Sequence, residues 1–424
     1  MLISFTLRNF KSFKDEMTLS LFSEKDTKPT LQVPYGNDKE VSILPSVALY
    51  GTNASGKTNL ILGLVYMQHF IVNCLNVPGL QRPLYDPFLL DKENPNKSVM
   101  FEVVLILNNT RFQYGFEYNQ DRILSEWLYS FSGMSKFKTW FQREWKNNSY
   151  VYTDNNITPN RKKIQEIANT RDDALYLAIA GVNYSNAVLR SIYDWFRNKL
   201  VVNPYSPYVN NLAIAETADL YLDEPQTNDN TNIVLDFMKN ADLHIDDVQI
   251  EREKIPVAEM NNKPPTRGNF AVNDGQFLKS YQIQLSHKGV YFDLNKESSG
   301  TIKMFSLASM WYKAIHQGKT LVIDELNTSL HPDLVILLLK YFNNSVLNPG
   351  KGQLIFSTHD TSIMHAEYLS REQIWFCVKN LHNHASEIYS LLDFGERADK
   401  SNYERQYRDG RYGAIPTIHR PEKW

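Results

Sequence analysis

Eight residues, GTNASGKT at positions 51–58, constrain the fold of this chain more than any other feature. They match the pattern G-x-x-x-x-G-K-[ST], in which backbone N–H groups of a glycine-rich loop surround phosphate oxygens. An apolar run at 46–50 precedes the loop, and an apolar helical pattern begins near Lys57. The alternative, a glycine-rich turn that arises by chance, would not require this context. The sequence therefore predicts a phosphate-binding loop between a buried strand and a helix.

The residues of this loop have separate expected roles. Lys57 would contact the β- and γ-phosphates of a nucleotide, and the Thr58 hydroxyl would bind Mg²⁺. Glycine is expected at both ends, because a Cβ there would obstruct the turn and the approach of the phosphate oxygens. The candidate nucleotide-binding residues are Gly51, Asn53, Ala54, Ser55, Gly56, Lys57, Thr58 and Asn59.

Two adjacent carboxylates, in LVIDE at positions 321–325, follow a second apolar strand, expected at 320–323. Burying both is costly unless a cation pairs with them. Asp324 is therefore expected to hold Mg²⁺, and Glu325 to polarise the attacking water as a general base. The alternative is a solvated strand end, which the phosphate-binding loop makes less attractive.

Three further sequence features lie before and after this acidic strand. Ser298 or Ser299 would cap a helix that starts beside Gly300, and this helix end offers a second place for phosphate. A loop at 326–331 leads into a helix with Pro332 in its first turn, and His359 follows another apolar strand, expected at 353–357. Singly, these are an ordinary cap and an ordinary strand-end histidine. Their order along the chain is the informative feature.

The rest of the chain divides into three segments. Residues 1–150 alternate as strands do, residues 151–280 are mostly helical in pattern, and residues 281–424 alternate strand and helix. A stretch rich in Pro, Asn and Gly at 256–275 is typical of a long exposed loop. The final alternation predicts a parallel α/β sheet, and with the phosphate loop it predicts a P-loop NTPase core assembled from both ends of the chain.

Charge and cysteine content exclude several classes of protein. The 45 Lys and Arg nearly balance the 47 Asp and Glu, so any nucleic-acid contact is expected to be a local patch. Cys74 and Cys377 stand far apart, which excludes a disulfide framework and a structural zinc site. No run approaches the length of a membrane-spanning helix, so we expect no membrane contact and a reducing, cytoplasmic location.

The order of phosphate loop, Ser-Gly helix start, Asp-Glu strand and strand-end histidine resembles the ABC-type ATPase heads of the RecF and SMC kind. The chain is also similar to the overcoming-lysogenisation (OLD-like) group of AAA-family ATPases, which includes Rlo-type and PARIS-type phage-defence proteins. The segments that carry this likeness are NFKSF at 9–13, DELNTSLHP at 324–332 and GRYGAIP at 410–416. The resemblance implies an ABC-ATPase head with an N-terminal β-rich part and an inserted helical lobe.

The resemblance also implies roles for residues at matching positions. Ser298 and Gly300, with Ser299 between them, would contact the γ-phosphate bound to the opposite subunit. Residues 329–331 would cross the dimer interface, and His359 would sense the γ-phosphate. Lys11 lies where related heads place a basic residue near the nucleotide, although a solvated lysine on an edge strand fits equally well.

This sequence departs from the general cassette pattern in three ways. Thr301 replaces the usual Gln or Glu that closes the signature, and His331 replaces the usual Asp of the interface loop. No glutamine is assigned as the one that senses Mg²⁺. These departures concern the rate of hydrolysis more than the binding of ATP.

The implied function is a switch driven by ATP and Mg²⁺ in a homodimer or larger homo-oligomer. The favoured role is the sensor ATPase of an antiviral defence system that controls a separately encoded effector, often a nuclease. The alternatives are a scaffold that ATP stabilises with little turnover, and a RecF-like DNA-repair ATPase. Residues 404–412 mix arginine and tyrosine, which suits a partner-binding surface or a solvated tail. The sequence has no sustained heptad pattern, so we expect no coiled-coil arm.

Overall fold

The computed structural model describes most of the 424-residue chain. It does not describe residues 25–28, 37–38, 76–84, 132–136, 155, 158–159, 184–185, 204–206, 224–231, 242, 257–269, 274–275, 396–401 and 416–424.

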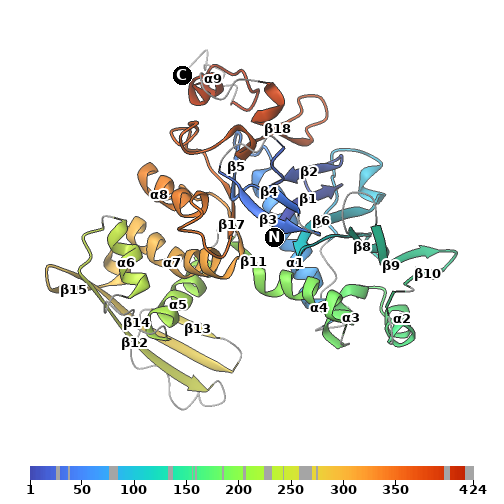
Figure 1. The fold of residues 1–424 in the computed structure, drawn as a ribbon, viewed down its shortest axis with the longest axis horizontal. Coiled ribbons are helices and arrows are strands. Elements are labelled where there is room, and N and C mark those ends of the chain that lie inside the picture. The colour runs from blue at the N-terminus through green and yellow to red at the C-terminus, as the bar shows by residue number, and fades with distance from the viewer. Residues whose placement is uncertain are drawn as a thin grey trace.

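A six-stranded sheet forms the centre of the molecule (Figure 1). Its order is β11, β16, β17, β5, β18 and β19, and all neighbours are parallel except the pair β18 and β19. The strands are β5 Ser46–Tyr50, β11 Leu200–Asn203, β16 Thr320–Ile323, β17 Gln353–Ser357, β18 Ile374–Lys379 and β19 Ser386–Ser390.

The central strands are buried on both faces, as parallel strands usually are. Every residue of β5, β16 and β17 is buried. Because successive side chains of a strand point to opposite faces, Val47 and Leu49 join one apolar cluster, whereas Ala48 and Tyr50 join a second. The sheet therefore separates two hydrophobic cores.

An antiparallel sheet of seven strands covers one side, in the order β10, β9, β8, β7, β6, β1 and β2. Helix α1, Lys57–Asn73, contributes Leu60, Leu64 and Phe70 to the core that also holds residues of this sheet. A hairpin of β3 Leu31–Tyr35 and β4 Lys39–Ile43 lies beside it. The seven strands are β1 Leu2–Arg8, β2 Met17–Ser20, β6 Val99–Leu107, β7 Thr110–Tyr118, β8 Ile123–Phe131, β9 Phe137–Lys146 and β10 Ser149–Thr153.

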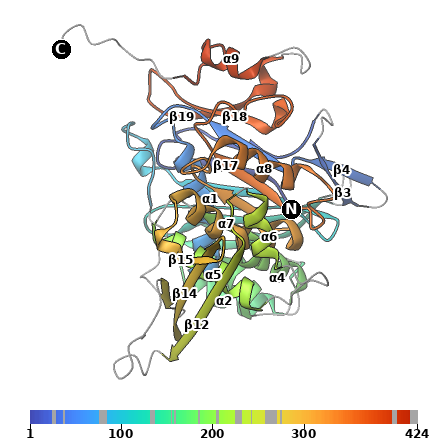
Figure 2. The ribbon, with the colours of Figure 1, turned by 90° about the vertical axis from the view of Figure 1, so that its left-hand side faces the viewer.

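The middle of the chain forms a set of helices and a third sheet. Its helices are α2 Arg161–Thr170, α3 Tyr176–Asn183, α4 Ala187–Asp194, a π-helical turn Trp195–Lys199, α5 Pro207–Asp223 and α6 Ile233–Asn240. The sheet is built from β12 Asp247–Pro256, β13 Phe270–Asn273, β14 Phe277–His287 and β15 Val290–Asp293. Figure 2 shows β12 and β14 extending away from the core sheet.

The second core contains α7 Ser299–Gln317 and α8 Pro332–Asn343. At 19 residues, α7 is the longest helix among the described residues. The described part contains no helix long and apolar enough to cross a membrane.

The expected strands at 46–50, 320–323 and 353–357 are confirmed. The segment 151–280 differs from the expected helical lobe, because it supplies the edge strand β11 to the core sheet and the strands β12 and β13 to another. Strand β11 has only four residues, too few to stand out beside a helical pattern. Of the expected loop at 256–275, residues 257–269 and 274–275 lie outside the described residues, and β13 occupies part of the rest.

In the C-terminal segment the tyrosines and the arginines lie in different environments. Tyr407 stacks on the ring of Phe376 with centroids 5.7 Å apart, and Tyr412 lies 5.2 Å from the same ring. The tyrosines are buried, whereas Arg405 and Arg408 of α9, Tyr403–Arg408, are exposed. The tyrosines expected at a binding surface therefore belong to the core.

Candidate functional site

The phosphate-binding loop joins β5 to α1, as expected. Gly51 and Gly56 have φ values of 151° and 115°, which side-chain-bearing residues rarely adopt. A Cβ on Gly51 would lie 2.2 Å from the carbonyl oxygen of Cys377, and one on Gly56 would lie 2.3 Å from the hydroxyl of Ser386. The described contacts that require glycine thus come from the neighbouring strands β18 and β19.

Lys57 is almost fully buried beneath the loop. Its ammonium group donates hydrogen bonds to the carbonyl oxygens of Gly51 at 2.8 Å and Thr52 at 2.9 Å. Burial lowers the pKa of Lys57, and the nearby Asp324 carboxylate partly opposes this shift. The side chain is therefore held at the loop by weak carbonyl partners, which a more strongly charged acceptor can replace.

The two expected metal ligands are in direct contact. The Thr58 hydroxyl donates to Oδ2 of Asp324 at 2.8 Å, across 266 residues of sequence. Asp324 is only 4% exposed, and its other carboxylate oxygen accepts a hydrogen bond from the Ser357 hydroxyl. A buried carboxylate beside a hydroxyl supplies the hard oxygen donors that Mg²⁺ prefers.

Glu325 lies at the end of β16 in an unusual backbone conformation, with φ of 50°. Its N–H donates to the Ser357 hydroxyl at 2.7 Å, and its Oε2 accepts from the Thr328 hydroxyl at 3.2 Å. The side chain is half-buried. A non-glycine residue in this region costs free energy, so the surrounding hydrogen bonds must hold it there.

His359 follows β17, the strand between β16 and β5. These three parallel strands end at the same edge of the sheet, where the first residues after each strand converge. Partial burial removes water from the imidazole of His359, and the positive charge of Lys57 disfavours its protonated form. Both effects lower the pKa of His359. The site therefore disfavours the charged form of its imidazole.

The start of α7 has the expected cap. The Ser298 hydroxyl accepts the N–H of Thr301 at 3.1 Å and lies 2.9 Å from the Thr301 hydroxyl. Ser298 and Ser299 are exposed. A Cβ on Gly300 would lie 2.9 Å from the carbonyl oxygen of Ser329, so the helix start rests on the loop after β16.

Lys11 contacts an acidic and an aromatic side chain. Its ammonium group forms an ion pair with Asp86 at 2.5 Å and lies 5.4 Å from the centre of the Tyr66 ring. Burial lowers the pKa of Lys11, but the hydrogen bond and charge of Asp86 outweigh this effect and raise it. These contacts differ from the solvated edge-strand alternative, because Lys11 lies in the turn after β1 and its ammonium group is ion-paired.

Three serines that sequence reasoning did not single out support the site. Ser12 accepts a hydrogen bond from the Asn59 amide at 2.8 Å and lies 2.7 Å from the Ser386 hydroxyl, which itself donates to the carbonyl of Ser55. Ser357 contacts both carboxylate residues after β16. Ser12 lies within the NFKSF segment, which carries the family resemblance, but no local pattern identified Ser12, Ser357 or Ser386 as site residues.

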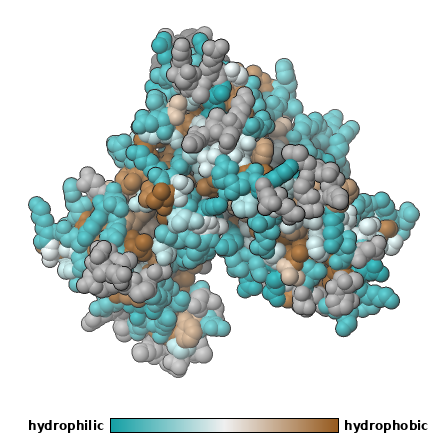
Figure 3. All heavy atoms as spheres, viewed as in Figure 1, coloured by the Kyte–Doolittle hydropathy of each residue, from teal (hydrophilic) through white to brown (hydrophobic). Residues whose placement is uncertain are grey.

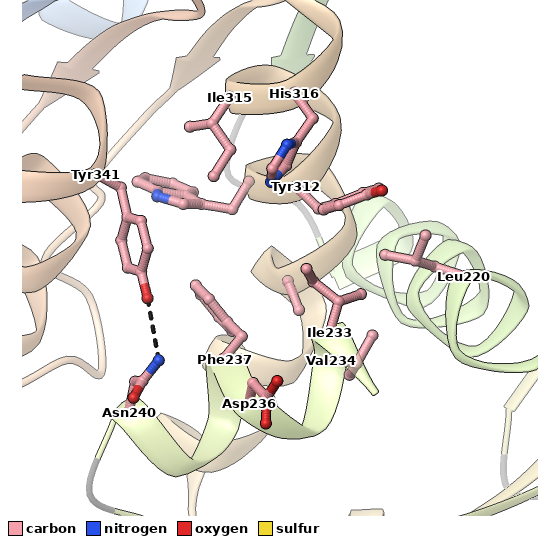
Figure 4. A pocket seen from close by; sticks show the side chains of 12 residues that line it. Leu220, Ile233, Val234, Asp236, Phe237, Asn240, Tyr312, Ile315, His316 and Tyr341 are labelled. Carbon is pink, nitrogen blue, oxygen red and sulfur yellow. Dashed lines mark hydrogen bonds between the residues drawn. The ribbon is translucent and has the colours of Figure 1, made fainter. Parts of the chain in front are cut away.

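A separate apolar pocket of about 150 Å³ lies farther along α7 (Figure 4). Phe237 and Asn240 of α6, Tyr312 of α7 and Tyr341 of α8 line it, and Asn240 bonds to the Tyr341 hydroxyl at 3.3 Å. Hydrophobic residues are visible near these helices in Figure 3, as they are at several other places on this face. No residue of the phosphate-binding loop lines this pocket.

Several solved SMC heads align with most of the chain. The SMC head domain from Thermotoga maritima is 15% identical, covers 92% of this chain and 98% of its own, and gives a TM-score of 0.42. An SmcHead bound to the C-winged helix domain of ScpA is 11% identical, with coverages of 92% and 97% and a TM-score of 0.45. A Pyrococcus furiosus Smc head bound to the C-terminal domain of ScpA is 12% identical, with coverages of 93% and 97% and a TM-score of 0.43.

No curated protein sequence matches the chain significantly. A family profile described as "AAA domain, putative AbiEii toxin, Type IV TA system" matches residues 46–365. The match begins at β5 and includes the phosphate-binding loop, the start of α7, both carboxylates after β16 and His359. It therefore extends over both parts of the P-loop ATPase core and the whole middle segment. The chain belongs to this family of AAA-domain ATPases.

Proposed function

We propose that this chain binds ATP with Mg²⁺ and hydrolyses it, and that the nucleotide controls its assembly with partners. The observation that carries the proposal is the 2.8 Å contact between the Thr58 hydroxyl and Asp324. It joins the phosphate-binding loop to the buried acidic strand end, and these are the two places where a P-loop ATPase holds its metal. The buried ammonium group of Lys57 supplies the matching positive charge.

In this mechanism the chain's own groups bind the nucleotide, orient it and accept a proton. Gly51, Gly56 and the N-terminus of α1 present N–H groups to phosphate oxygens, and Lys57 exchanges its carbonyl partners for them. Thr58 and Asp324 hold Mg²⁺, which when bound neutralises charge on the phosphates. Glu325 accepts the proton of the attacking water at its carboxylate.

We further propose that two heads enclose the nucleotides between them. Ser298 and Ser299 are exposed, and the hydroxyl of Ser298 serves its own helix cap. A serine hydroxyl at a helix N-terminus is a favourable place for a phosphate. Ser298 and Gly300 then act on the ATP of the partner subunit, and neutral His359 donates a hydrogen bond to the γ-phosphate of its own.

The finer family proposal is an OLD-like ATPase, similar to Rlo-type and PARIS-type phage-defence proteins. The segments at 9–13, 324–332 and 410–416 support it. The family description names a toxin–antitoxin system, which supports a role beside a separately encoded partner. We propose a sensor ATPase that controls an effector, with a nuclease as the favoured effector.

The C-terminal segment is the proposed partner-binding element. Arg405, Arg408 and Arg411 are exposed on it. The Thr361 hydroxyl donates to Glu404 of α9 at 3.0 Å, two residues beyond His359, and this contact links the nucleotide site to the segment. A nucleic-acid contact would be local and would use such arginines.

ATP turnover tests the proposal and separates the alternatives. We expect wild-type protein with Mg²⁺ to release phosphate, and Glu325→Gln to bind ATP but release almost none, because an amide cannot act as a base. Negligible wild-type turnover with intact ATP binding would favour the scaffold. Strong stimulation by duplex DNA would favour the RecF-like repair role.

A further inference from the structure

One amide side chain connects the two loops that carry Glu325 and His359, and no motif assigns it a role. Asn327 follows Glu325 by two residues and is half-buried. Its Oδ1 accepts a hydrogen bond from the Thr358 hydroxyl at 3.0 Å and another from the backbone N–H of His359 at 3.3 Å. Thr358 itself is fully buried.

The Thr358 hydroxyl extends this connection by one residue. It accepts the N–H of Asp360 at 3.0 Å while it donates to Asn327. The N–H groups of two successive residues after β17 therefore depend on one amide oxygen, one directly and one through a hydroxyl. The backbone N–H of Thr358 bonds to the carbonyl of Leu49 at 3.1 Å, so the base of the loop stays anchored to β5.

We propose that Asn327 is a positioning residue that fixes the backbone of His359 relative to Glu325. This inference rests on the proposed function, because the roles of Glu325 and His359 belong to it. The imidazole of His359 is exposed, so its direction depends mainly on where its backbone is held. A short polar side chain with a fixed oxygen suits this task, whereas a residue without an acceptor would leave the His359 N–H and the Thr358 hydroxyl without this partner.

Substitutions at the two ends of the contact test the proposal. Asn327→Ala should lower kcat about tenfold and leave KM for ATP within about twofold, because the loop and metal residues keep their contacts. Thr358→Val, which keeps the shape but loses the hydroxyl, should lower kcat about threefold. Thr358→Ser restores the hydroxyl and should restore kcat. The variant that combines Asn327→Ala with Thr358→Val should have the same kcat as Asn327→Ala alone, because both substitutions break the same hydrogen-bonded connection.

Hydrogen–deuterium exchange gives a readout that does not depend on turnover. In Asn327→Ala the peptide that covers residues 357–361 should exchange at least several-fold faster, while the peptide of the phosphate-binding loop stays unchanged. Asn344→Ala is the matched control: its side-chain oxygen also accepts two N–H groups, at the far end of α8, and its loss should change neither readout.

The outcomes separate the two proposals. Absence of ATP turnover by the wild type would contradict the proposed function, and the exchange data would still decide whether Asn327 holds the loop. Wild-type exchange and kcat in Asn327→Ala would overturn the positioning role. If that variant fails to fold, equal kcat for Thr358→Val and Thr358→Ser would overturn it instead.

Discussion

The phosphate-binding loop and the start of α7 are both expected to contact phosphate, yet the chain holds them in different ways. Gly51 and Gly56 are wedged against backbone and side-chain atoms of β18 and β19, and Lys57 is buried. Helix α7 begins with its cap Ser298 and with Ser299, and both residues are exposed. The first region makes its contacts within one chain, whereas the second presents polar groups outward.

In the proposed shared site, this difference would divide the work between two subunits. A region that is already packed can bind nucleotide in the monomer, because little conformational entropy remains to be lost. An exposed helix start gains partners only when another surface arrives. We therefore expect binding to depend on the loop alone, and hydrolysis to depend on both regions.

The largest expected effect is the loss of nucleotide binding in Lys57→Ala. This change removes a buried cation, and charge-assisted hydrogen bonds each contribute about 1.5–3 kcal/mol, so affinity for a non-hydrolysable ATP analogue should fall by about 100-fold or more. Calorimetry measures it. Ser298→Ala is the comparison and should bind the analogue nearly as well as wild type in the monomer. Undiminished affinity in Lys57→Ala would show that the loop is not the site.

The next effect concerns stability of the packed region. Gly51→Ala would place a Cβ 2.2 Å from the carbonyl oxygen of Cys377, which cannot move without disturbing β18. We expect a loss of about 3 kcal/mol. At Gly289, which also has a positive φ but open space around it, the same substitution should cost only about 1 kcal/mol. Equal falls in melting temperature for the two variants would contradict the close packing.

A charge at the exposed region should act between subunits. Ser298→Asp keeps a good helix cap but adds a carboxylate, which should lower ATP turnover at least about tenfold by repelling a γ-phosphate. Ser298→Asn keeps the cap without the charge and should lose less. Mixed with Lys57→Ala chains, Ser298→Asp chains should regain part of the activity, because one site of the heterodimer is intact. Normal turnover by Ser298→Asp alone would remove the shared-site proposal.

The smallest effect is a pH dependence from His359, whose pKa lies below its usual 6.5. The unfolded chain binds a proton at a higher pH than the folded one, so this group's stabilising contribution is present above pH 6.5 and is lost as pH falls through the folded pKa. His359→Gln should reduce this dependence below pH 6.5. Melting temperatures of both proteins between pH 5 and 8 measure it; parallel curves would mean that His359 does not titrate as described.

Local signals were enough to predict much of the core and its motifs. Apolar runs identified β5, β16 and β17 at their observed bounds, and the cap Ser298 and the first-turn residue Pro332 marked helix starts within a residue or two. These features depend on a few consecutive residues, because burial on both faces requires continuous apolar side chains and caps act within one turn.

Other features were settled only by neighbours distant in sequence. Strand β11 is a strand because β16 offers it a parallel edge, and Tyr407 is buried because Phe376 lies beneath it. Ser357 and Asn327 look like ordinary polar loop residues, and their hydrogen bonds appear only once β16 and β17 lie side by side.

The sequence by itself thus determined the class of chemistry, because phosphate binding and cation binding need particular residue types at fixed local spacing. Tertiary structure decided which of these groups touch. It brought Thr58 to Asp324 across 266 residues, paired Lys11 with Asp86, and turned the tyrosines of the C-terminal segment inward. The physical reason is that burial and ion pairing depend on the whole packed arrangement, which no short stretch of sequence contains.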